Sequence, residues 1–263
     1  MYTFEYHRPA SREAAVAAAQ GEARFLAGGQ SLVQAMRLRL SSTEHMVDLG
    51  GIADLAGITA DASQLTIGAM TTHAAVAASP QVRRAIPALA NLANNIGDPS
   101  VRNMGTLGGS IANSDPAADY PAALLALGAT VQTSKRAIPA DAFFTGLYET
   151  ALEPGELVVS VSFPIPKRAA YEKLPQPASH FALVGVFVCE GAGGVRVAVT
   201  GAGPCVFRAK ELEAALSRQF TSEALQGVAL SADSLNTDMH GTAAYRAAMC
   251  TVMAQRAVAR ATA

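Results

Sequence analysis

The spacing of apolar residues divides the first half of the chain into short strands and helices. Tyr2, Phe4 and Tyr6 alternate with more polar residues, which is the period of a half-buried strand. Pro9 ends that strand, and Ser11 is a suitable N-cap for the alanine-rich helix that follows. Further strands are predicted at 23–27, 46–49 and 65–67, and further helices at 32–40, 72–77 and 81–94.

A segment rich in Gly, Asn, Ser, Asp and Pro, residues 96–119, interrupts this regular pattern. A helix is predicted to follow at 116–127. Its signals are Asp115 as the N-cap, Pro116 in the first helical position and Gly128 after the last turn.

The order of elements changes at Pro164-Ile-Pro166, which indicates a domain boundary. Strands at 130–133 and 157–163 precede it. After the boundary strands come first and helices later, an arrangement typical of α+β domains. The predicted strands there are 170–174, 180–189 and 195–200, and the predicted helices are 209–217, 222–229 and 242–260.

Composition and charge narrow the class of protein. The chain has 263 residues, half of them hydrophobic, and a formal net charge of -1. This balance disfavours nucleic acid as a partner, because phosphate binding needs clustered Lys and Arg. The first residues do not resemble a signal peptide, and no apolar run approaches the ~20 residues that cross a bilayer. We therefore expect a cytoplasmic protein without membrane insertion.

Cysteines and histidines bear on redox chemistry. Cys189, Cys205 and Cys250 are odd in number and far apart, so they do not form a disulfide framework. An ordinary iron–sulfur cluster takes four cysteine thiolates, and the chain has three cysteines. The histidines lack the H-x-x-x-H and H-E-x-x-H spacings of metal sites. No metal site is expected, and any redox chemistry must use an organic cofactor.

Two pairs of glycines are candidates for binding a phosphate group. They lie in Ala27-Gly-Gly-Gln-Ser31 and in Thr106-Leu-Gly-Gly-Ser110, where a strand is predicted to give way to a turn. Glycine lets a ligand approach the main chain, and successive exposed N–H groups form a concave anion site. The first pair leads directly into a helix at Leu32, which suits a phosphate. Either pair can instead form a tight turn without a ligand, and neither matches the Rossmann or P-loop pattern.

These segments resemble the FAD-binding medium subunits of molybdenum hydroxylases, which include bacterial carbon monoxide dehydrogenase, xanthine dehydrogenase and the N-heterocycle dehydrogenases. The resemblance spans nearly the whole chain, and segment 96–119 is its most specific part. The matching segments are Ala27–Leu32 with Arg37–Leu40, Ile67–Thr72, Ile96–Asp119, Tyr171–Leu174 and Asp238–Arg246.

The resemblance implies an α+β fold with a two-lobed FAD-binding domain of the vanillyl-alcohol-oxidase (PCMH) type. This domain would span residues 1–166, with lobes at about 1–55 and 56–166. A smaller α+β C-terminal domain, an antiparallel sheet plus helices, would span residues 167–263. FAD would be held non-covalently by this chain, whereas molybdopterin and [2Fe–2S] clusters would belong to partner subunits.

The resemblance also implies which residues bind the cofactor. Backbone N–H groups at 28–32 would wrap the pyrophosphate, and residues 106–110 would close on it from the other side. Asp119 would lie near the ribityl chain, although it also suits the first turn of a helix. Asp115 is either a helix cap or a cofactor contact, and Lys173 would lie near the flavin edge. The predicted set is Ala27, Gly28, Gly29, Gln30, Ser31, Leu32, Gly68, Ala69, Thr72, Ile96, Gly97, Val101, Thr106, Gly108, Gly109, Ser110, Asn113, Asp115, Asp119, Lys173 and Phe181.

Two positions depart from the family pattern. Gln30 stands where related oxidases carry a histidine that bonds to the flavin, and an amide cannot form that bond, so the FAD should dissociate. His180-Phe181 stands where several relatives have an acidic residue followed by tyrosine beside the isoalloxazine. Phe181 can cover a flavin face but has no hydroxyl, which bears on the flavin potential and the choice of oxidant.

No nucleophile–base pair or carboxylate dyad is evident, which suits a subunit that moves electrons. The resemblance implies a large molybdopterin subunit that oxidises the substrate and a small [2Fe–2S] subunit that passes electrons to this FAD. The complex would be a dimer of heterotrimers, with quinone, NAD⁺, oxygen or another carrier as the acceptor. The alternatives are a self-sufficient flavin-dependent reductase or oxidase of the same superfamily, and a non-catalytic assembly subunit.

Overall fold

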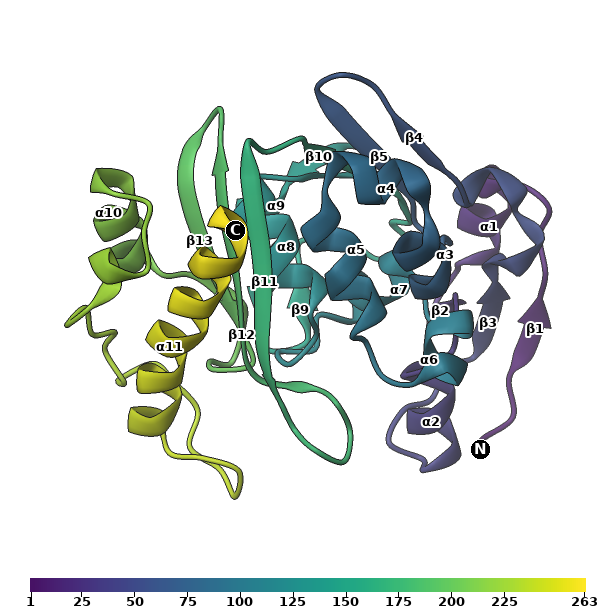
Figure 1. The fold of residues 1–263 in the computed structure, drawn as a ribbon. Coiled ribbons are helices and arrows are strands. Elements are labelled where there is room, and N and C mark those ends of the chain that lie inside the picture. Colours follow the sequence, from purple (N-terminus) through teal and green to yellow (C-terminus); the bar gives the residue numbers. More distant parts are fainter.

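The computed structural model describes residues 1–263 and arranges them around three main sheets (Figure 1). A parallel three-stranded sheet carries the N-terminus at one end of the molecule. An antiparallel four-stranded sheet with the last helices occupies the other end, and a five-stranded antiparallel sheet with most helices lies between them. No helix combines the length and the apolar character needed to cross a membrane.

The N-terminal sheet has the strand order β1-β3-β2, with parallel neighbours. A small core between this sheet and the first helix contains the fully buried residues Ala15 and Val47. Ser11 caps that helix as predicted, because its hydroxyl accepts the N–H of Ala14. The elements are β1 (Glu5–His7), α1 (Arg12–Ala18), β2 (Ala23–Leu26), α2 (Leu32–Arg37), β3 (His45–Asp48) and the 3-10 turns η1 (Leu49–Gly51) and η2 (Ala53–Leu55).

Two element boundaries in this part differ from the sequence prediction. The first strand covers residues 5–7 only, and the tyrosines of the predicted alternation, Tyr2 and Tyr6, are both exposed. Helix α2 ends at Arg37 and not near Leu40, because Arg39 takes a left-handed φ of 59°. Two backbone bonds, from Leu40 N–H to the Ala35 carbonyl and from Arg39 N–H to the Met36 carbonyl, close the helix there.

The central sheet has the order β4-β5-β10-β6-β7 and is antiparallel throughout. Its strands are β4 (Ile58–Ala60), β5 (Gln64–Gly68), β6 (Thr130–Thr133), β7 (Ala137–Pro139) and β10 (Val158–Pro164). A small hairpin, β8 (Phe144–Gly146) and β9 (Glu149–Thr150), follows the last helix of this part. The helices are α3 (His73–Ala78), α4 (Pro80–Ala85), α5 (Pro87–Asn94), α6 (Pro99–Met104), α7 (Leu107–Asn113), α8 (Tyr120–Leu127) and α9 (Ala140–Phe143).

Helix α8 joins the central part to the C-terminal sheet. All its residues are apolar and all are buried, which is the composition of a helix covered on every side. It contacts β10 of the central sheet and β12 and β13 of the C-terminal sheet. The two sheets therefore share one continuous core.

The C-terminal sheet, in the order β11-β12-β13-β14, is covered on both faces. Alternate residues of β12 enter different cores: Val186 and Val188 face helices α10 and α11, whereas Phe187 and Cys189 face α8. An antiparallel sheet followed by helices is what the α+β prediction required. The elements are β11 (Arg168–Pro175), β12 (Ala182–Gly191), β13 (Gly194–Thr200), β14 (Phe207–Arg208), α10 (Lys210–Arg218), η3 (Glu223–Leu225) and α11 (Ala243–Thr262).

Two predicted helices are broken or shortened for local reasons. The helix predicted at 81–94 is two helices, α4 and α5, because Ile86 precedes a proline and leaves the helical conformation with φ -142° and ψ 77°. The helix predicted at 222–229 is a single 3-10 turn, η3, which is followed by Gly227 at a φ of 76°.

The helix predicted from Pro116 begins at Tyr120 instead, so Asp115 is not its N-cap. Asp115 starts a separate turn in which its carboxylate accepts the N–H of Ala117 at 2.8 Å. Tertiary contacts keep this turn from joining the helix, because the Thr200 hydroxyl donates to the carbonyls of Pro116 and Ala118. Those two carbonyls therefore accept hydrogen bonds from a residue of the C-terminal sheet and not from a helix.

Candidate functional site

A cavity of about 470 Å³ lies where the N-terminal sheet, the central helices and the C-terminal sheet meet. Both glycine pairs line it, although almost eighty residues separate them along the chain. Further wall residues come from segments 19–25, 69–73, 96–101, 112–119, 152–158 and 179–181. Both segments that the sequence predicted to bind a phosphate group therefore line the same cleft.

The two glycine segments touch each other at the cavity. A Cβ atom on Gly28 would lie 2.7 Å from the Cα of Gly105, closer than real Cβ contacts come. A Cβ on Gly109 would lie 3.4 Å from the Cβ of Ala27. Gly29 has a φ of 70°, which turns the chain from β2 into α2. Glycine is thus required at 28 by the approach of the opposite segment.

The first glycine segment presents unused hydrogen-bond donors. No backbone or side-chain acceptor of the chain takes the N–H groups of Gly28, Gly29, Gln30 and Ser31. Gln30 turns its side chain inward, and its amide donates to the Gly28 carbonyl at 3.1 Å. Consecutive free N–H groups before a helix suit a phosphate.

The second glycine segment is built differently from the turn that the sequence predicted. Gly108 and Gly109 lie in the first turn of helix α7, with Thr106 as its N-cap. The Gly108 N–H donates to the Ala69 carbonyl at 2.8 Å, and the Gly109 N–H donates to the Thr106 hydroxyl at 3.1 Å. Both amides already have acceptors within the chain and are not free to bind a ligand. The groups of this segment that remain for a ligand are the side chain of Ser110 and a surface of small residues.

The Thr106 cap gives a testable prediction of modest size. Replacing Thr106 with valine keeps the shape but leaves the Gly109 N–H without an acceptor at a position where Thr106 is only 3% exposed. We expect a loss of about 1 kcal/mol in the free energy of unfolding. Urea unfolding measures it, with Thr59→Val on the exposed strand β4 as the control that should change little. Equal unfolding midpoints for wild type and Thr106→Val would contradict the capping role.

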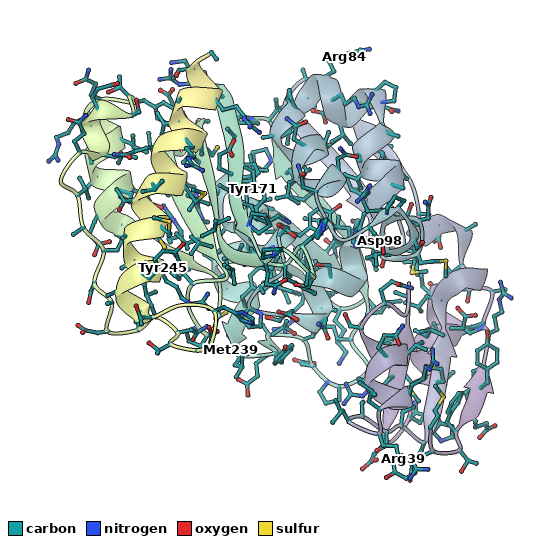
Figure 2. The ribbon with its side chains drawn as sticks, turned by 60° about the horizontal axis from the view of Figure 1, so that its bottom comes forward. Arg39, Arg84, Asp98, Tyr171, Met239 and Tyr245 are labelled. Carbon is teal, nitrogen blue, oxygen red and sulfur yellow. The ribbon has the colours of Figure 1, made fainter.

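A buried ionic cluster stands behind the cavity. The Lys173 ammonium lies 2.9 Å from Oδ1 of Asp119, and the Tyr171 hydroxyl donates to the same oxygen at 2.6 Å. Lys173 also donates to the carbonyls of Asn95 and His180. Figure 2 shows Tyr171 in the interior of the molecule, between the C-terminal sheet and the central helices.

The charge of Asp119 depends on this cluster. Burial raises the pKa of the Asp119 carboxyl, while the Lys173 ammonium and the Tyr171 hydroxyl oppose that rise. Oδ2 of Asp119 has no partner in the chain, and Asp119 lines the cavity. A hydroxyl-bearing ligand could donate to that oxygen.

Lys173 does not line the cavity, unlike the flavin-edge position that the resemblance implied. Its side chain is 7% exposed and links β11 to the end of α5. Through the His180 carbonyl it also positions segment 179–181, where His180 takes a φ of 64° and Phe181 forms part of the cavity wall. Lys173 is therefore a positioning residue.

His73 is a cavity residue that the sequence analysis missed. It is 4% exposed, and its Nδ1 is buried without a hydrogen-bond partner. Its ring centre lies 5.4 Å from that of Tyr120, whose hydroxyl is also buried and unpartnered. The sequence offered one indication of this role: His73 directly follows Ile67–Thr72, one of the segments that resemble the flavoprotein family. A lone histidine, however, is usually a packing residue.

The environment of His73 predicts a pH dependence of stability. Burial, helped by the nearby Arg102, lowers the pKa of His73 from 6.5 to about 4. Between these values the unfolded chain binds the proton and the folded chain does not, so stability falls as pH falls. At pH 4.5 the loss for the FAD-free chain is about 2.5 kcal/mol.

Urea unfolding at pH 7 and pH 4.5 tests this linkage by comparison with His73→Gln, which cannot take up the proton. Wild type should lose about 2.5 kcal/mol more than His73→Gln between the two pH values. His240→Gln, at an exposed histidine, serves as the control and should follow wild type. Parallel losses in wild type and His73→Gln would exclude His73 as the titrating group.

Of the predicted cofactor-binding residues, all but Gly68, Thr72 and Lys173 line the cavity. Thr72 caps helix α3, since its hydroxyl accepts the Ala75 N–H at 3.2 Å. Gly68 packs against the backbone of Leu55 at the end of β5. Asp115 lines the cavity and receives a hydrogen bond from Tyr148 at 3.3 Å.

Known proteins are similar to this chain over nearly its whole length. Residues 2–166 match a family model described as the FAD binding domain in molybdopterin dehydrogenase, and residues 169–261 match the CO dehydrogenase flavoprotein C-terminal domain. The carbon monoxide dehydrogenase medium chain of Hydrogenophaga pseudoflava is 37% identical over 274 residues, covering 97% of this chain and 96% of that relative. The nicotine 6-hydroxylase medium subunit of Paenarthrobacter nicotinovorans is 32% identical, with coverages of 97% and 96%.

Solved structures agree with these matches. The carbon monoxide dehydrogenase of Hydrogenophaga pseudoflava that lacks the Mo-pyranopterin moiety of the molybdenum cofactor contains a chain with a TM-score of 0.91 and 38% identity. The match covers 99% of this chain and 98% of that one. The predicted fold, an FAD-binding domain followed by a smaller C-terminal domain, is confirmed.

Proposed function

Since this chain belongs to the family of FAD-binding medium subunits of the molybdenum hydroxylases, an oxidoreductase family, we propose that it is the subunit through which electrons leave such an enzyme. The electrons would come from [2Fe–2S] clusters in a small partner subunit, after a large molybdopterin subunit has oxidised the substrate. FAD, when bound, supplies the redox chemistry, and the protein supplies its position and electrostatic surroundings.

The observation that carries this proposal is the row of free N–H groups at 28–31, which faces α7 across one cleft. These groups would bind the pyrophosphate, with Ser110 adding a hydroxyl. Oδ2 of Asp119 would accept from a ribityl hydroxyl, and Phe181 would cover the flavin. Because Gln30 cannot bond covalently to the flavin and is committed to the turn, the FAD would be dissociable.

The wider assembly is part of the same proposal. Relatives carry the names medium chain and medium subunit, which supports a complex with a large and a small subunit. The full assembly we propose is a dimer of such heterotrimers. The complex would be cytoplasmic. Within the chain we assign residues 1–166 to FAD binding, with lobes at 1–55 and 56–166, and residues 167–263 to the C-terminal domain. The separate sheets of these segments support the division.

Purification of the native complex from its host tests the proposal. We expect the chain to copurify with a molybdopterin protein and an iron–sulfur protein, and acid precipitation to release its flavin into solution. A complex without flavin would contradict the FAD assignment. An isolated chain that turns over a small organic substrate without partners would contradict the electron-transfer role and favour a self-sufficient flavin-dependent reductase or oxidase.

A further inference from the structure

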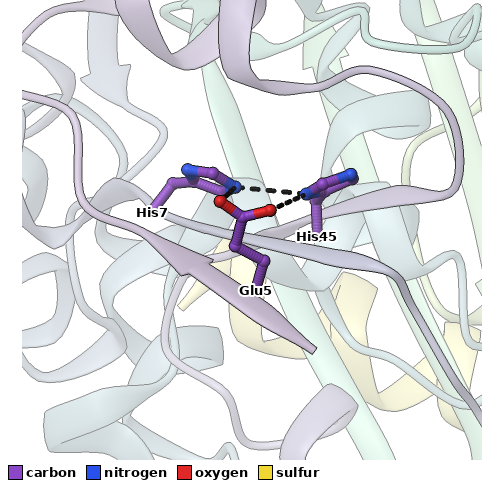
Figure 3. A group of neighbouring side chains, drawn as sticks. All are labelled: Glu5, His7 and His45. Carbon is purple, nitrogen blue, oxygen red and sulfur yellow. Dashed lines mark hydrogen bonds and ion pairs between the residues drawn. The ribbon is translucent and has the colours of Figure 1, made fainter. Parts of the chain in front are cut away.

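Three metal-ligating side chains meet on the N-terminal sheet, and none of them lines the cavity of the glycine segments. Glu5 and His7 are two residues apart on β1, so their side chains leave the same face of the strand. His45 begins the neighbouring strand β3 and is the register partner of Glu5. Figure 3 shows the two imidazole rings and the carboxylate converging on one point.

The distances between the donor atoms fit one small cation. Nε2 of His7 lies 3.2 Å from Nδ1 of His45, and the Glu5 carboxylate oxygens lie 3.4 Å from His45 and 3.8 Å from His7. Donors about 2.0–2.1 Å from a tetrahedral metal are about 3.3 Å from one another. A cation between the three atoms would need only small movements, chiefly of Glu5, which is 66% exposed.

The two histidines are held in place by the fold. Their side chains are about 30% exposed, and parallel strand pairing fixes the separation of β1 and β3. The buried hydroxyl of Thr43 anchors the start of β3 by donating to the carbonyls of Glu22 and His45. A site with preformed ligands loses less conformational entropy on binding.

We propose that Glu5, His7 and His45 form a site for a divalent transition-metal cation, with Zn²⁺ as its natural occupant. Two imidazole nitrogens and one carboxylate suit Zn²⁺, whereas Mg²⁺ and Ca²⁺ prefer all-oxygen sites. Three protein ligands leave a fourth position for water. The cation would clamp the N-terminal strand β1 to β3. This site differs from the expectation of no metal site, because its ligands come from separate strands and spacing along the chain cannot reveal them.

The test is titration of the tag-free full-length chain with ZnCl₂ against a chromophoric chelator, together with CoCl₂ as a spectroscopic probe. We expect one Zn²⁺ per chain, visible absorption bands typical of tetrahedral Co²⁺, and a higher unfolding temperature with Zn²⁺. His45→Gln and His7→Gln should weaken binding by more than about tenfold, since even a residue that only orients a ligand is worth roughly 10- to 100-fold. Glu5→Gln should weaken it as well.

His240→Gln is the matched control, because it removes an exposed histidine outside the cluster. It should bind Zn²⁺ as wild type does. Retained FAD binding shows that each variant is folded, and at least one of the three ligand variants should pass that check. Zn²⁺ binding that is equal in wild type and in a folded His45→Gln or His7→Gln overturns the proposal, as does a wild-type chain that cannot compete with the chelator.

Discussion

Replacing Gly28 with valine should abolish tight FAD binding. The new side chain would collide with the backbone at Met104 and Gly105, so the first glycine segment must move away from α7. This movement of the first glycine segment displaces the free N–H groups of residues 28–31 from the positions in which they can bind the pyrophosphate. Loss of two charge-assisted hydrogen bonds, each worth about 1.5–3 kcal/mol, corresponds to at least a ~100-fold weaker affinity.

Quenching of FAD fluorescence during titration of the FAD-free chain measures this effect. Gly193→Val is the matched control: Gly193 lies in the β12–β13 hairpin, and a Cβ there would have no atom within 4 Å. It should bind FAD like wild type. A folded Gly28→Val chain with wild-type affinity would show that the first glycine segment does not hold the cofactor.

Replacing Lys173 with methionine should cost about 3–5 kcal/mol of stability, the usual penalty for leaving a buried charge without its partner. Asp119 is 4% exposed, and two backbone carbonyls would lose their donor in the same change. Urea unfolding at pH 7 measures the loss. The double variant Lys173→Met/Asp119→Asn removes the stranded carboxylate and should recover part of it.

Lys135→Met provides a matched control for the same chemistry at the surface. Lys135 lies 2.8 Å from Glu153, as close as Lys173 lies to Asp119, but both partners are about half exposed. Exposed pairs contribute about 0–1 kcal/mol, so this variant should be nearly as stable as wild type. Similar losses for Lys135→Met and Lys173→Met would mean that burial does not set the strength of the inner pair.

Predictions from the sequence succeeded where the signal was local. Ser11 caps α1 and Gly128 ends α8 at a φ of 64°, because a cap depends on a few neighbouring residues. The glycine pair at 28–29, singled out from its residue types alone, lies in the cavity wall, and its binding of the cofactor stays a prediction. One prediction failed because two local signals conflict. The apolar pattern at 81–94 favours a single helix, but Pro87 excludes the helical conformation at Ile86 and divides it.

Other errors came from contacts that no local pattern contains. The helix expected from Pro116 starts later because Thr200, far along the chain, binds the carbonyls of that turn. His73 belongs to no motif that marks it as a site residue, and only the fold places it in the cavity wall. Lys173 lies beside Asp119 and outside the cavity lining, so its expected place at the flavin edge stays a prediction.

The sequence by itself determined many of the local units: most longer strands and helices, although not α6 and α7, and a glycine turn leading into α2 at a left-handed φ that favours glycine. Tertiary structure decided which of these units meet. The approach of Gly28 to Gly105, the pair of Asp119 and Lys173, and the cluster of Glu5, His7 and His45 all join separate segments. Local preferences act over a few residues, whereas these contacts depend on how the whole chain buries its apolar surface.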